Sequence, residues 1–220
     1  MSGIQQNFAY GRSFGPPNGW PVNIGDAYGG GFFAGQINVS GTKYNLVIAP
    51  KSSGESALLW GTYGVTTGFT SDINGPANSA GEAALGAAYQ AAAFCEGLTI
   101  GGYTDWYLPA RNELEVLYYY LKPTTSANNT SSGSNANAVS PEPVSQNYTS
   151  GFPAQTTATG TNGFRVGEAN ALAAGAFEAY YSSTESSATH ANVQVMSSGF
   201  QSGEAKNYGA YVRAVRRVLA

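Results

Sequence analysis

The sequence has few charged residues, and this scarcity excludes one class of partner. Charged side chains make up 10% of its 220 residues, compared with about 25% in an average soluble protein. The net charge of −3 leaves no cluster of Lys and Arg to hold a phosphate backbone. We therefore expect no nucleic-acid partner and a surface dominated by hydroxyl and amide groups.

Cysteine and histidine are nearly absent, with one residue of each. Cys95 has no partner for an internal disulfide, and its Ala-rich surroundings predict a small buried side chain in a helix. Nucleophilic catalysis needs a nucleophile beside a base, whereas His190 lies in a polar segment that predicts a loop. A zinc site needs several Cys or His ligands. The sequence thus predicts no enzymatic activity, no metal and no cofactor.

Long apolar runs are also missing. No stretch approaches the roughly 18 residues that span a bilayer. Residues 2–7 are polar and lack the basic and apolar regions of a secretion signal. We expect no membrane insertion and synthesis in a cytoplasm without such a signal.

Glycine, proline and aromatic residues crowd the first 26 residues. Pro16-Pro17-Asn18-Gly19 and Trp20-Pro21 punctuate the chain too densely for a regular element, while the aromatic side chains favour burial. We interpret residues 1–26 as an extended N-terminal arm that packs on its own domain or on a neighbouring subunit.

Two early segments predict a β-hairpin. Residues 31–38 and 43–49 flank Ser40-Gly41, a pair suited to a tight turn. Tyr44, Leu46 and Ile48 alternate along the second segment, so we expect a strand with one deeply buried face.

Two helices follow a Gly- and Thr-rich loop that continues to Pro76. Ser79-Ala80-Gly81-Glu82 has the residues of a capping box, so a helix is expected to begin there and to end near Gly97. Leucine and tyrosine spacing predicts a second helix over 111–121. Ala110 precedes it where Ser or Thr would accept a backbone hydrogen bond that is worth about 1 kcal/mol.

The C-terminal part of the chain begins with a polar insertion. Residues 122–163 are rich in Ser, Thr, Asn and Gly, too poor in apolar groups to pack a core of their own, and predict a surface insertion. Residues 191–201 and 208–218 predict two strands. Strands, helices and further strands in this order indicate one α+β domain over 27–220.

Three motifs carry a resemblance to a known family. Gly102-Tyr103-Thr104-Asp105-Trp106-Tyr107-Leu108-Pro109 is followed by Tyr180-Tyr181-Ser182-Ser183-Thr184 and by Tyr211-Val212-Arg213-Ala214-Val215-Arg216. These segments resemble the Lcl C-terminal type of domain, which is found in bacterial surface adhesins and phage tail-fibre proteins. The resemblance covers about residues 27–218.

The resemblance implies a C-type-lectin-like fold. Two helices would clasp a twisted antiparallel sheet, with the N- and C-terminal strands paired and long loops outside the frame. The motif residues would then be structural: Asp105, Trp106, Leu108, Pro109, Tyr181, Ser182, Ser183, Thr184, Arg213 and Arg216.

This sequence departs from the family pattern at several positions. Tyr107 replaces the usual Arg, so an expected ion pair is lost or replaced by a ring contact. Tyr181 replaces a Trp, and Asn192 stands where another Trp is common. The frame should tolerate these changes, whereas a ligand shared with the family does not follow.

Arginine side chains bridge carboxylates well, so the acidic residues near the motifs are expected to pair structurally. The candidate carboxylates and their partners are Asp105, Glu113, Glu115 and Glu185 with Arg111, Arg213 or Arg216.

In related phage and diversity-generating proteins, the variable surface lies before the last strand. It maps to residues 186–194 and 201–207, whose short uncharged side chains suit hydrogen bonding to a glycan or protein, although solvated loops look similar. Glu142-Pro143-Val144 matches the calcium-binding tripeptide of lectins only in part, and we predict no calcium site. The candidate ligand-binding residues are Thr189, His190, Asn192, Gln194, Gln201, Ser202 and Asn207.

The resemblance and the arm together suggest a function. The expected protein is a non-enzymatic bacteriophage virion component on the particle surface, as a head decoration, a fibre or a tail receptor-binding protein. Its arm would contact other capsid or tail proteins, its exposed surface would meet a host glycan or protein, and it would form a homo-oligomer. The alternative is a bacterial surface lectin or adhesin module that binds host polysaccharide.

Overall fold

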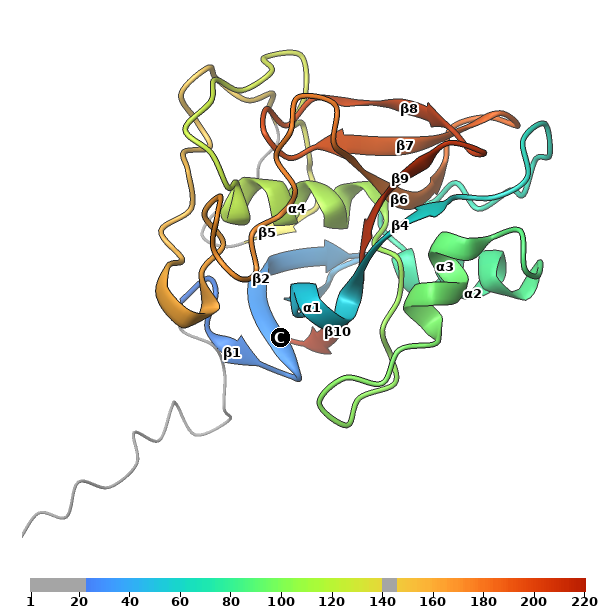
Figure 1. Cartoon of the computed structure of the whole chain (residues 1–220), viewed down its shortest axis with the longest axis horizontal. Helices are drawn as coiled ribbons and strands as arrows, with labels where there is room; N and C mark the ends of the chain where they lie inside the picture. Colours follow the sequence, from blue (N-terminus) through green and yellow to red (C-terminus); the bar gives the residue numbers. More distant parts are fainter. Residues whose placement is uncertain (1–22, 140–145) are drawn as a thin grey trace, which may run out of the picture.

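A computed structural model describes residues 23–139 and 146–220. The predicted arm therefore lies outside the described residues except for its last four, and so does Glu142-Pro143-Val144. The described chain is a mixed α+β structure with two curled, mostly antiparallel sheets (Figure 1). None of its helices combines the length and the hydropathy of a membrane span.

The first sheet contains the predicted hairpin. Its strands run β1 (Ala27–Tyr28), β2 (Gly31–Val39), β3 (Thr42–Ile48) and β10 (Val215–Leu219), and β5 (Ala138–Val139) pairs with β2. Ser40 and Gly41 have φ values of 52° and 91°, the left-handed backbone that a two-residue hairpin turn requires. The hairpin is confirmed, and the C-terminal strand β10 pairs antiparallel with β3.

The second sheet has the order β4-β9-β6-β7-β8. Its strands are β4 (Glu55–Leu59), β6 (Ala179–Glu185), β7 (His190–Val195), β8 (Gln201–Ala205) and β9 (Gly209–Arg213). Neighbouring strands are antiparallel, except that β6 and β9 meet in parallel at Tyr180 and Tyr211. β8 therefore forms one edge of this sheet.

Both predicted C-terminal strands are divided in the structure. The expected strand over 191–201 ends at Val195, because a turn containing Gly199 at φ 71° folds β8 back against β7. The expected strand over 208–218 passes from β9 in the second sheet to β10 in the first sheet at Ala214. The N–H of Ala214 donates to Gly54 O at 2.9 Å, and its carbonyl accepts from Ala49 N–H at 3.0 Å.

The described residues form four helices rather than the two expected, of which α1 (Lys51–Gly54) is a single turn. The expected helix over 111–121 is confirmed as α4 (Arg111–Leu121). The start expected at Ser79 is wrong, because α2 (Gly75–Ala84) begins near Pro76, and α3 (Gln90–Glu96) follows a break at Gly86, where φ is 104°.

The supposed capping box therefore lies inside α2. The Ser79 hydroxyl accepts a hydrogen bond from Leu108 N–H at 3.0 Å, which ties the helix to the next segment of the chain. Glu82 is buried, and burial raises the pKa of its carboxyl well above the usual range. Both side chains thus join α2 to the core instead of capping its first turn.

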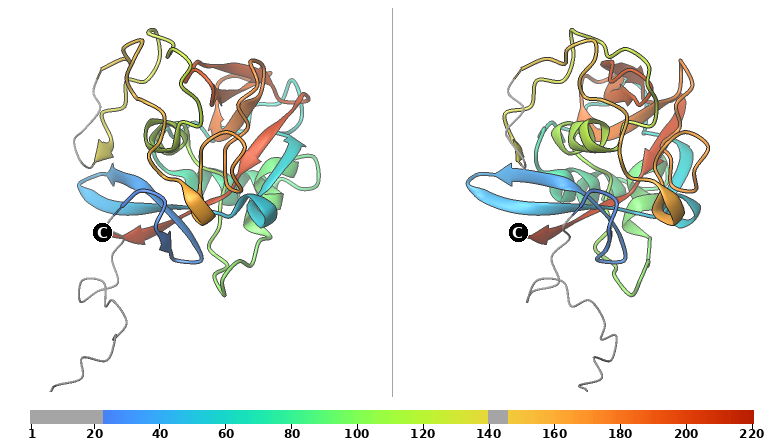
Figure 2. Two further views of the ribbon diagram at one scale, coloured as in Figure 1. Left: turned by 60° about the vertical axis from the view of Figure 1, so that its left-hand side comes forward. Right: turned by 90° about the vertical axis from the view of Figure 1, so that its left-hand side faces the viewer.

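The helix α4 lies between the two sheets. It contacts β2 and β5 of the first sheet and β6 and β7 of the second, and both views of Figure 2 show it beside the β2–β3 hairpin. Leu114, Val116, Leu117 and Leu121 from α4 are buried in the larger of two hydrophobic clusters. The smaller cluster contains Trp60, Cys95 and Trp106, so the expected burial of Cys95 is confirmed.

The insertion is more closely integrated than a surface segment. Its described parts carry little regular structure, yet Ala138, Tyr148 and Ala158 belong to the larger hydrophobic cluster. Buried Asn128 accepts from Lys122 Nζ at 2.6 Å and donates to Pro153 O at 3.0 Å. Side-chain amides therefore hold this segment together with a few apolar side chains, which explains how its polar composition is compatible with packing.

Candidate functional site

The segment before α4 joins the helical side of the domain to the last strand. Backbone hydrogen bonds of 2.9 and 3.0 Å pair Tyr107 with Val215 of β10. Trp106 is fully buried, and its Nε1 donates to Tyr103 O at 3.1 Å. Trp106 and Tyr107 of this motif are therefore part of the core of the domain.

Asp105 and Arg216 form the polar part of this junction. Arg216 Nε and Nη2 donate to the two carboxylate oxygens of Asp105 at 2.7 and 2.9 Å, a bidentate pair. Its Nη1 also donates to Gly29 O at 3.0 Å, and the guanidinium lies 3.8 Å from the Tyr103 ring centre. One side chain on β10 thus connects three segments that are far apart in the sequence.

Glu113 accepts a hydrogen bond at the start of α4 and forms an ion pair beside Tyr107. The N–H of Ala110 donates to Glu113 Oε2 at 2.8 Å. Tyr107 Oη and Arg217 Nε both donate to Glu113 Oε1 at 2.6 Å. Arg217 therefore supplies the cation that Tyr107 cannot provide. Its guanidinium lies 5.8 Å from the Tyr107 ring centre, which is the ring contact given as one of the two expected outcomes.

The Tyr180–Thr184 motif is the interior strand β6, and each of its side chains is buried. Thr184 Oγ1 accepts from Arg111 N–H at 3.0 Å and donates to Ser71 O at 2.9 Å. Ser183 N–H donates to Pro109 O at 2.8 Å. The strand thereby supplies hydrogen-bond partners, from outside the helix, to the backbone at the start of α4.

Arg213, the last residue of β9, joins its strand to the segment after β3 and to β4. It is fully buried, its Nε donates to Ala49 O at 2.7 Å and its Nη1 pairs with Glu55 at 2.8 Å.

Of the ten motif residues, nine are buried and the carboxylate of Asp105 is occupied by Arg216. No group of His, Cys, Asp or Glu that could hold a metal occurs in the described ranges.

A buried ion pair fixes the turn after β8. Lys206 Nζ contacts Glu185 Oε1, donates to Val65 O at 2.7 Å and lies 4.8 Å from the Trp60 ring centre. Burial favours a higher pKa for Glu185, but bonds from Lys206, Thr67 and Gly68 hold it below the usual value. Lys206 is therefore structural, although it falls within the segment expected to meet a ligand.

The seven candidate ligand-binding residues do not form one surface. Gln194 is buried, and its Nε2 donates to Tyr148 Oη at 3.0 Å, so placing it on a ligand surface is wrong. Asn192 Nδ2 donates to Thr184 O at 3.1 Å. Gln201 Oε1 accepts from Gly133 N–H at 3.2 Å. These three side chains connect the sheet internally and to the insertion.

The remaining four candidates lie along the β7–β8 ribbon and the turn after it. His190 is the first residue of β7 rather than part of a loop, and its Nδ1 is 2.8 Å from Thr189 Oγ1. Ser202 and Asn207 are exposed, but strand register puts Ser202 opposite Val193, on the other face from Gln194 and Gln201. Because of this register, the predicted residues point to both faces of the sheet, which the sequence alone did not reveal.

A hollow on the second sheet was not predicted from the sequence. It has a volume of about 280 Å³ and is bordered by β4, β8, β9 and the residues around the start of β6. We call it the aromatic hollow. Its larger side chains are Phe177, Glu178, Glu204, Tyr208 and Tyr211, and the small residues Ala57, Ala179, Gly209 and Ala210 also line it. Phe177 in an Ala- and Gly-rich segment and Tyr208 in a polar segment were the available sequence signal.

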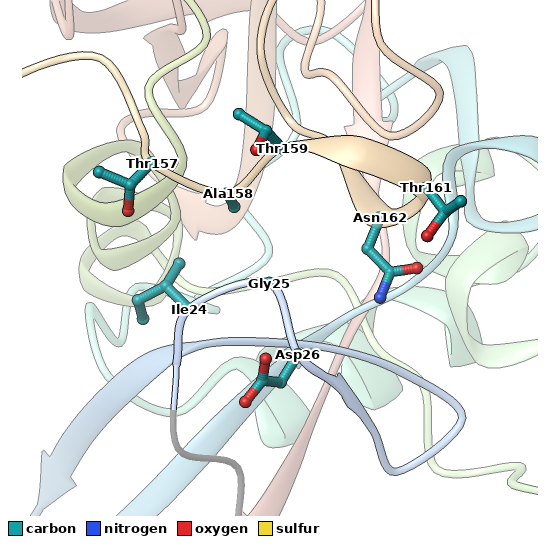
Figure 3. Close-up of a pocket in the computed structure, with 8 residues that line it drawn as sticks. All are labelled: Ile24, Gly25, Asp26, Thr157, Ala158, Thr159, Thr161 and Asn162. Carbon is teal, nitrogen blue, oxygen red and sulfur yellow. The ribbon is translucent and has the colours of Figure 1, made fainter.

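A second hollow lies where the described chain begins. Figure 3 shows Ile24, Gly25 and Asp26 facing a segment of Thr157, Ala158 and Thr159, with Thr161 and Asn162 beside them. A Cβ at Gly25 would lie 2.7 Å from Ala158 Cβ, so glycine permits this close approach. The hollow is lined by hydroxyl and amide groups and by the Asp26 carboxylate.

Comparison with known proteins gives one family. The model of the Lcl C-terminal domain family matches residues 54–216, which is more than half of the chain. The match begins after the β2–β3 hairpin and is therefore narrower than the range 27–218 suggested by the motifs. No curated protein matches the sequence.

Proposed function

Because the chain belongs to the Lcl C-terminal domain family, we propose that it is a non-enzymatic display module on the surface of a bacteriophage virion. It would serve as a head decoration, a fibre or a tail receptor-binding component that contacts the host. We also propose that its frame is C-type-lectin-like. The pairing of the N-terminal hairpin with the C-terminal strand and the contacts of α4 with both sheets support this assignment.

One observation carries the functional proposal. Most motif residues are buried and stabilise the domain, whereas the second sheet ends in an exposed polar edge and turn at Ser202, Gly203 and Asn207. A domain that buries its motif residues and exposes short neutral side chains is suited to presenting a binding surface rather than to catalysis. The low charge of the chain is compatible with contact to an uncharged partner.

Particle localisation tests this proposal. Antibody raised against the purified chain should label purified virions in electron micrographs, and the chain should co-sediment with them. Deletion of residues 1–26 should remove the label while the remaining domain still unfolds cooperatively on heating. The exposed-residue variant Tyr63→Ala is the control for incorporation. Unlabelled wild-type particles would contradict the virion role, and normal incorporation of the deletion variant would contradict anchoring by the arm.

The second candidate is a bacterial surface lectin or adhesin module that binds host polysaccharide. The aromatic hollow favours it, because aromatic and carboxylate side chains surround one concave site. This alternative predicts the chain on the cell envelope in fractionation experiments, without phage particles. Recovery in virions alone would exclude it.

A further inference from the structure

We propose that the aromatic hollow binds a terminal sugar residue of an uncharged glycan. The proposal rests on the host-attachment function and places its ligand on a different set of residues from the predicted β7–β8 surface. The hollow combines exposed rings, carboxylates and a preorganised tyrosine, and each component restricts the ligand.

The exposed rings supply an apolar contact. Phe177 is 98% exposed and Tyr208 is 61% exposed, yet both line the same hollow. Large aromatic side chains gain free energy by burial, so two exposed rings at one concave site indicate a place that a ligand covers. The C–H face of a pyranose ring is flat and apolar, and it packs against an aromatic side chain of this kind.

The polar groups indicate a neutral ligand with several hydroxyls. Glu178 and Glu204 contribute carboxylates that accept hydrogen bonds from sugar hydroxyls. None of the described residues that line the hollow is Lys, Arg or His. Uronate, sialate or sulfate groups would therefore meet like charge without a compensating cation, which selects against acidic polysaccharides.

The hollow is held in shape by the family motif. The Tyr211 ring stacks on Tyr180 with 5.4 Å between ring centres, and Tyr180 Oη donates to Glu55 Oε2 at 2.6 Å. Tyr181 Oη donates to Tyr208 O at 3.1 Å and so fixes the backbone beneath the exposed ring. The motif tyrosines thus support the site from behind, which lowers the conformational cost of binding.

Tyr211 is the donor of the site. Its hydroxyl lies 3.5 Å from Glu178 Oε1, and Gly175 N–H holds the other carboxylate oxygen at 2.6 Å. The Glu178 charge raises the pKa of Tyr211. The phenol proton is directed to Glu178 across a long contact, so a sugar hydroxyl that replaces this contact would accept it. The volume of about 280 Å³ lies at the lower limit of the roughly 300–1,000 Å³ typical of ligand pockets. One sugar residue at a chain end fits this space better than a buried oligomer.

Binding of defined glycans to the full-length chain tests the inference. Neutral probes are oligomers of glucose, galactose and N-acetylglucosamine; acidic probes are polygalacturonate and heparin. We expect saturable binding of at least one neutral probe, measured by calorimetry, and no binding of the acidic probes. Phe177→Ala and Tyr208→Ala should each raise the dissociation constant about five- to tenfold, the range expected for loss of one aromatic contact. Glu204→Gln should also weaken binding.

Tyr63→Ala is the matched control, because Tyr63 is 53% exposed and lies outside the hollow. It should leave the dissociation constant unchanged, and thermal unfolding should show that each variant is folded. Failure of every neutral probe to bind, equal binding of an acidic probe, or unchanged affinity in both aromatic variants would overturn the proposal. Virion labelling of the wild-type chain is independent of these results, so failure of the sugar site is distinguishable from failure of the virion role.

Discussion

At the scale of single residues, Arg216 shows how much of the frame depends on one guanidinium. It pairs with Asp105, reaches Gly29 O and stacks on Tyr103. Lysine carries the same charge but cannot form a planar bidentate pair together with a ring contact. The geometry of Arg216, beyond its charge, therefore joins the segment before α4 to β10.

We predict that Arg216→Lys lowers the free energy of unfolding by about 1–2 kcal/mol, since a bidentate bond and a cation–π contact are lost and Asp105 is half exposed to solvent. Chemical denaturation measures the change. Arg111→Lys is the matched control, because Arg111 and Asp72 are exposed and 3.8 Å apart, and its effect should stay below about 0.5 kcal/mol. Equal effects of the two substitutions would refute this account of Arg216.

Glu115 is expected to make stability depend on pH. Burial raises its pKa from 4.5 to about 7, although Asn135 and Tyr148 donate to its carboxylate. A folded pKa above the unfolded value means that the contribution is complete below about pH 4.5 and is lost as pH rises to about 7. The shift corresponds to about 3 kcal/mol.

The comparison with Glu115→Gln isolates this group, because other acids titrate alike in both proteins. The wild-type free energy of unfolding, measured relative to the variant, should fall by up to about 3 kcal/mol between about pH 5 and pH 8. Urea unfolding at several pH values provides the measurement. A difference that does not change with pH would show that Glu115 is not titrating in this range.

At the scale of elements, α4 is completed by a residue from a distant strand. Thr184 of β6 accepts from Arg111 N–H and donates to Ser71 O, so its hydroxyl supplies what Ala110 lacks. We predict that Thr184→Val lowers the free energy of unfolding by about 1–2 kcal/mol, the usual effect of losing a helix cap, in denaturant titrations.

Ser183→Ala is the control for that prediction, because the buried Ser183 hydroxyl has no hydrogen-bond partner in the described structure. Removing it should be neutral or stabilising. Destabilisation by Ser183→Ala as large as that by Thr184→Val would show that any change of a buried hydroxyl in β6, rather than loss of the cap, causes the effect.

Elements that depend on local signals were predictable, and those that depend on distant partners were not. The turn at Ser40-Gly41 and the apolar face of 111–121 carry their own signals. The strand division at Ala214 depends on backbone bonds to Ala49 and Gly54, which no pattern near residue 214 reveals. Likewise, the aromatic hollow combines residues from β4, β8 and β9, and the parallel contact between β6 and β9 brings them together.

At the scale of the whole molecule, the insertion is expected to detach before the two sheets separate. Its attachment uses Tyr148, whose hydroxyl donates to Glu115 Oε1 at 2.7 Å and accepts from Gln194. Tyr148→Phe leaves these buried polar groups with fewer partners, so we predict faster proteolysis and amide exchange within 122–163 while the second sheet stays protected.

Tyr120→Phe provides the comparison, because the buried Tyr120 hydroxyl has no partner in the described structure. Exchange in the insertion should then match the wild type. Uniform loss of protection across the domain of Tyr148→Phe would instead show that the insertion and the sheets unfold as a single unit.

The crossing at Ala214 has a mechanical consequence. β9 borders the aromatic hollow in the second sheet, and one residue later β10 begins in the first sheet, paired with β3. Tension applied at the hollow therefore enters the first sheet along a covalent backbone, without having to pass through side-chain packing. Rows of hydrogen bonds to β4 and β3 lie on the two sides of the crossing, so they would share a pull and resist it in shear.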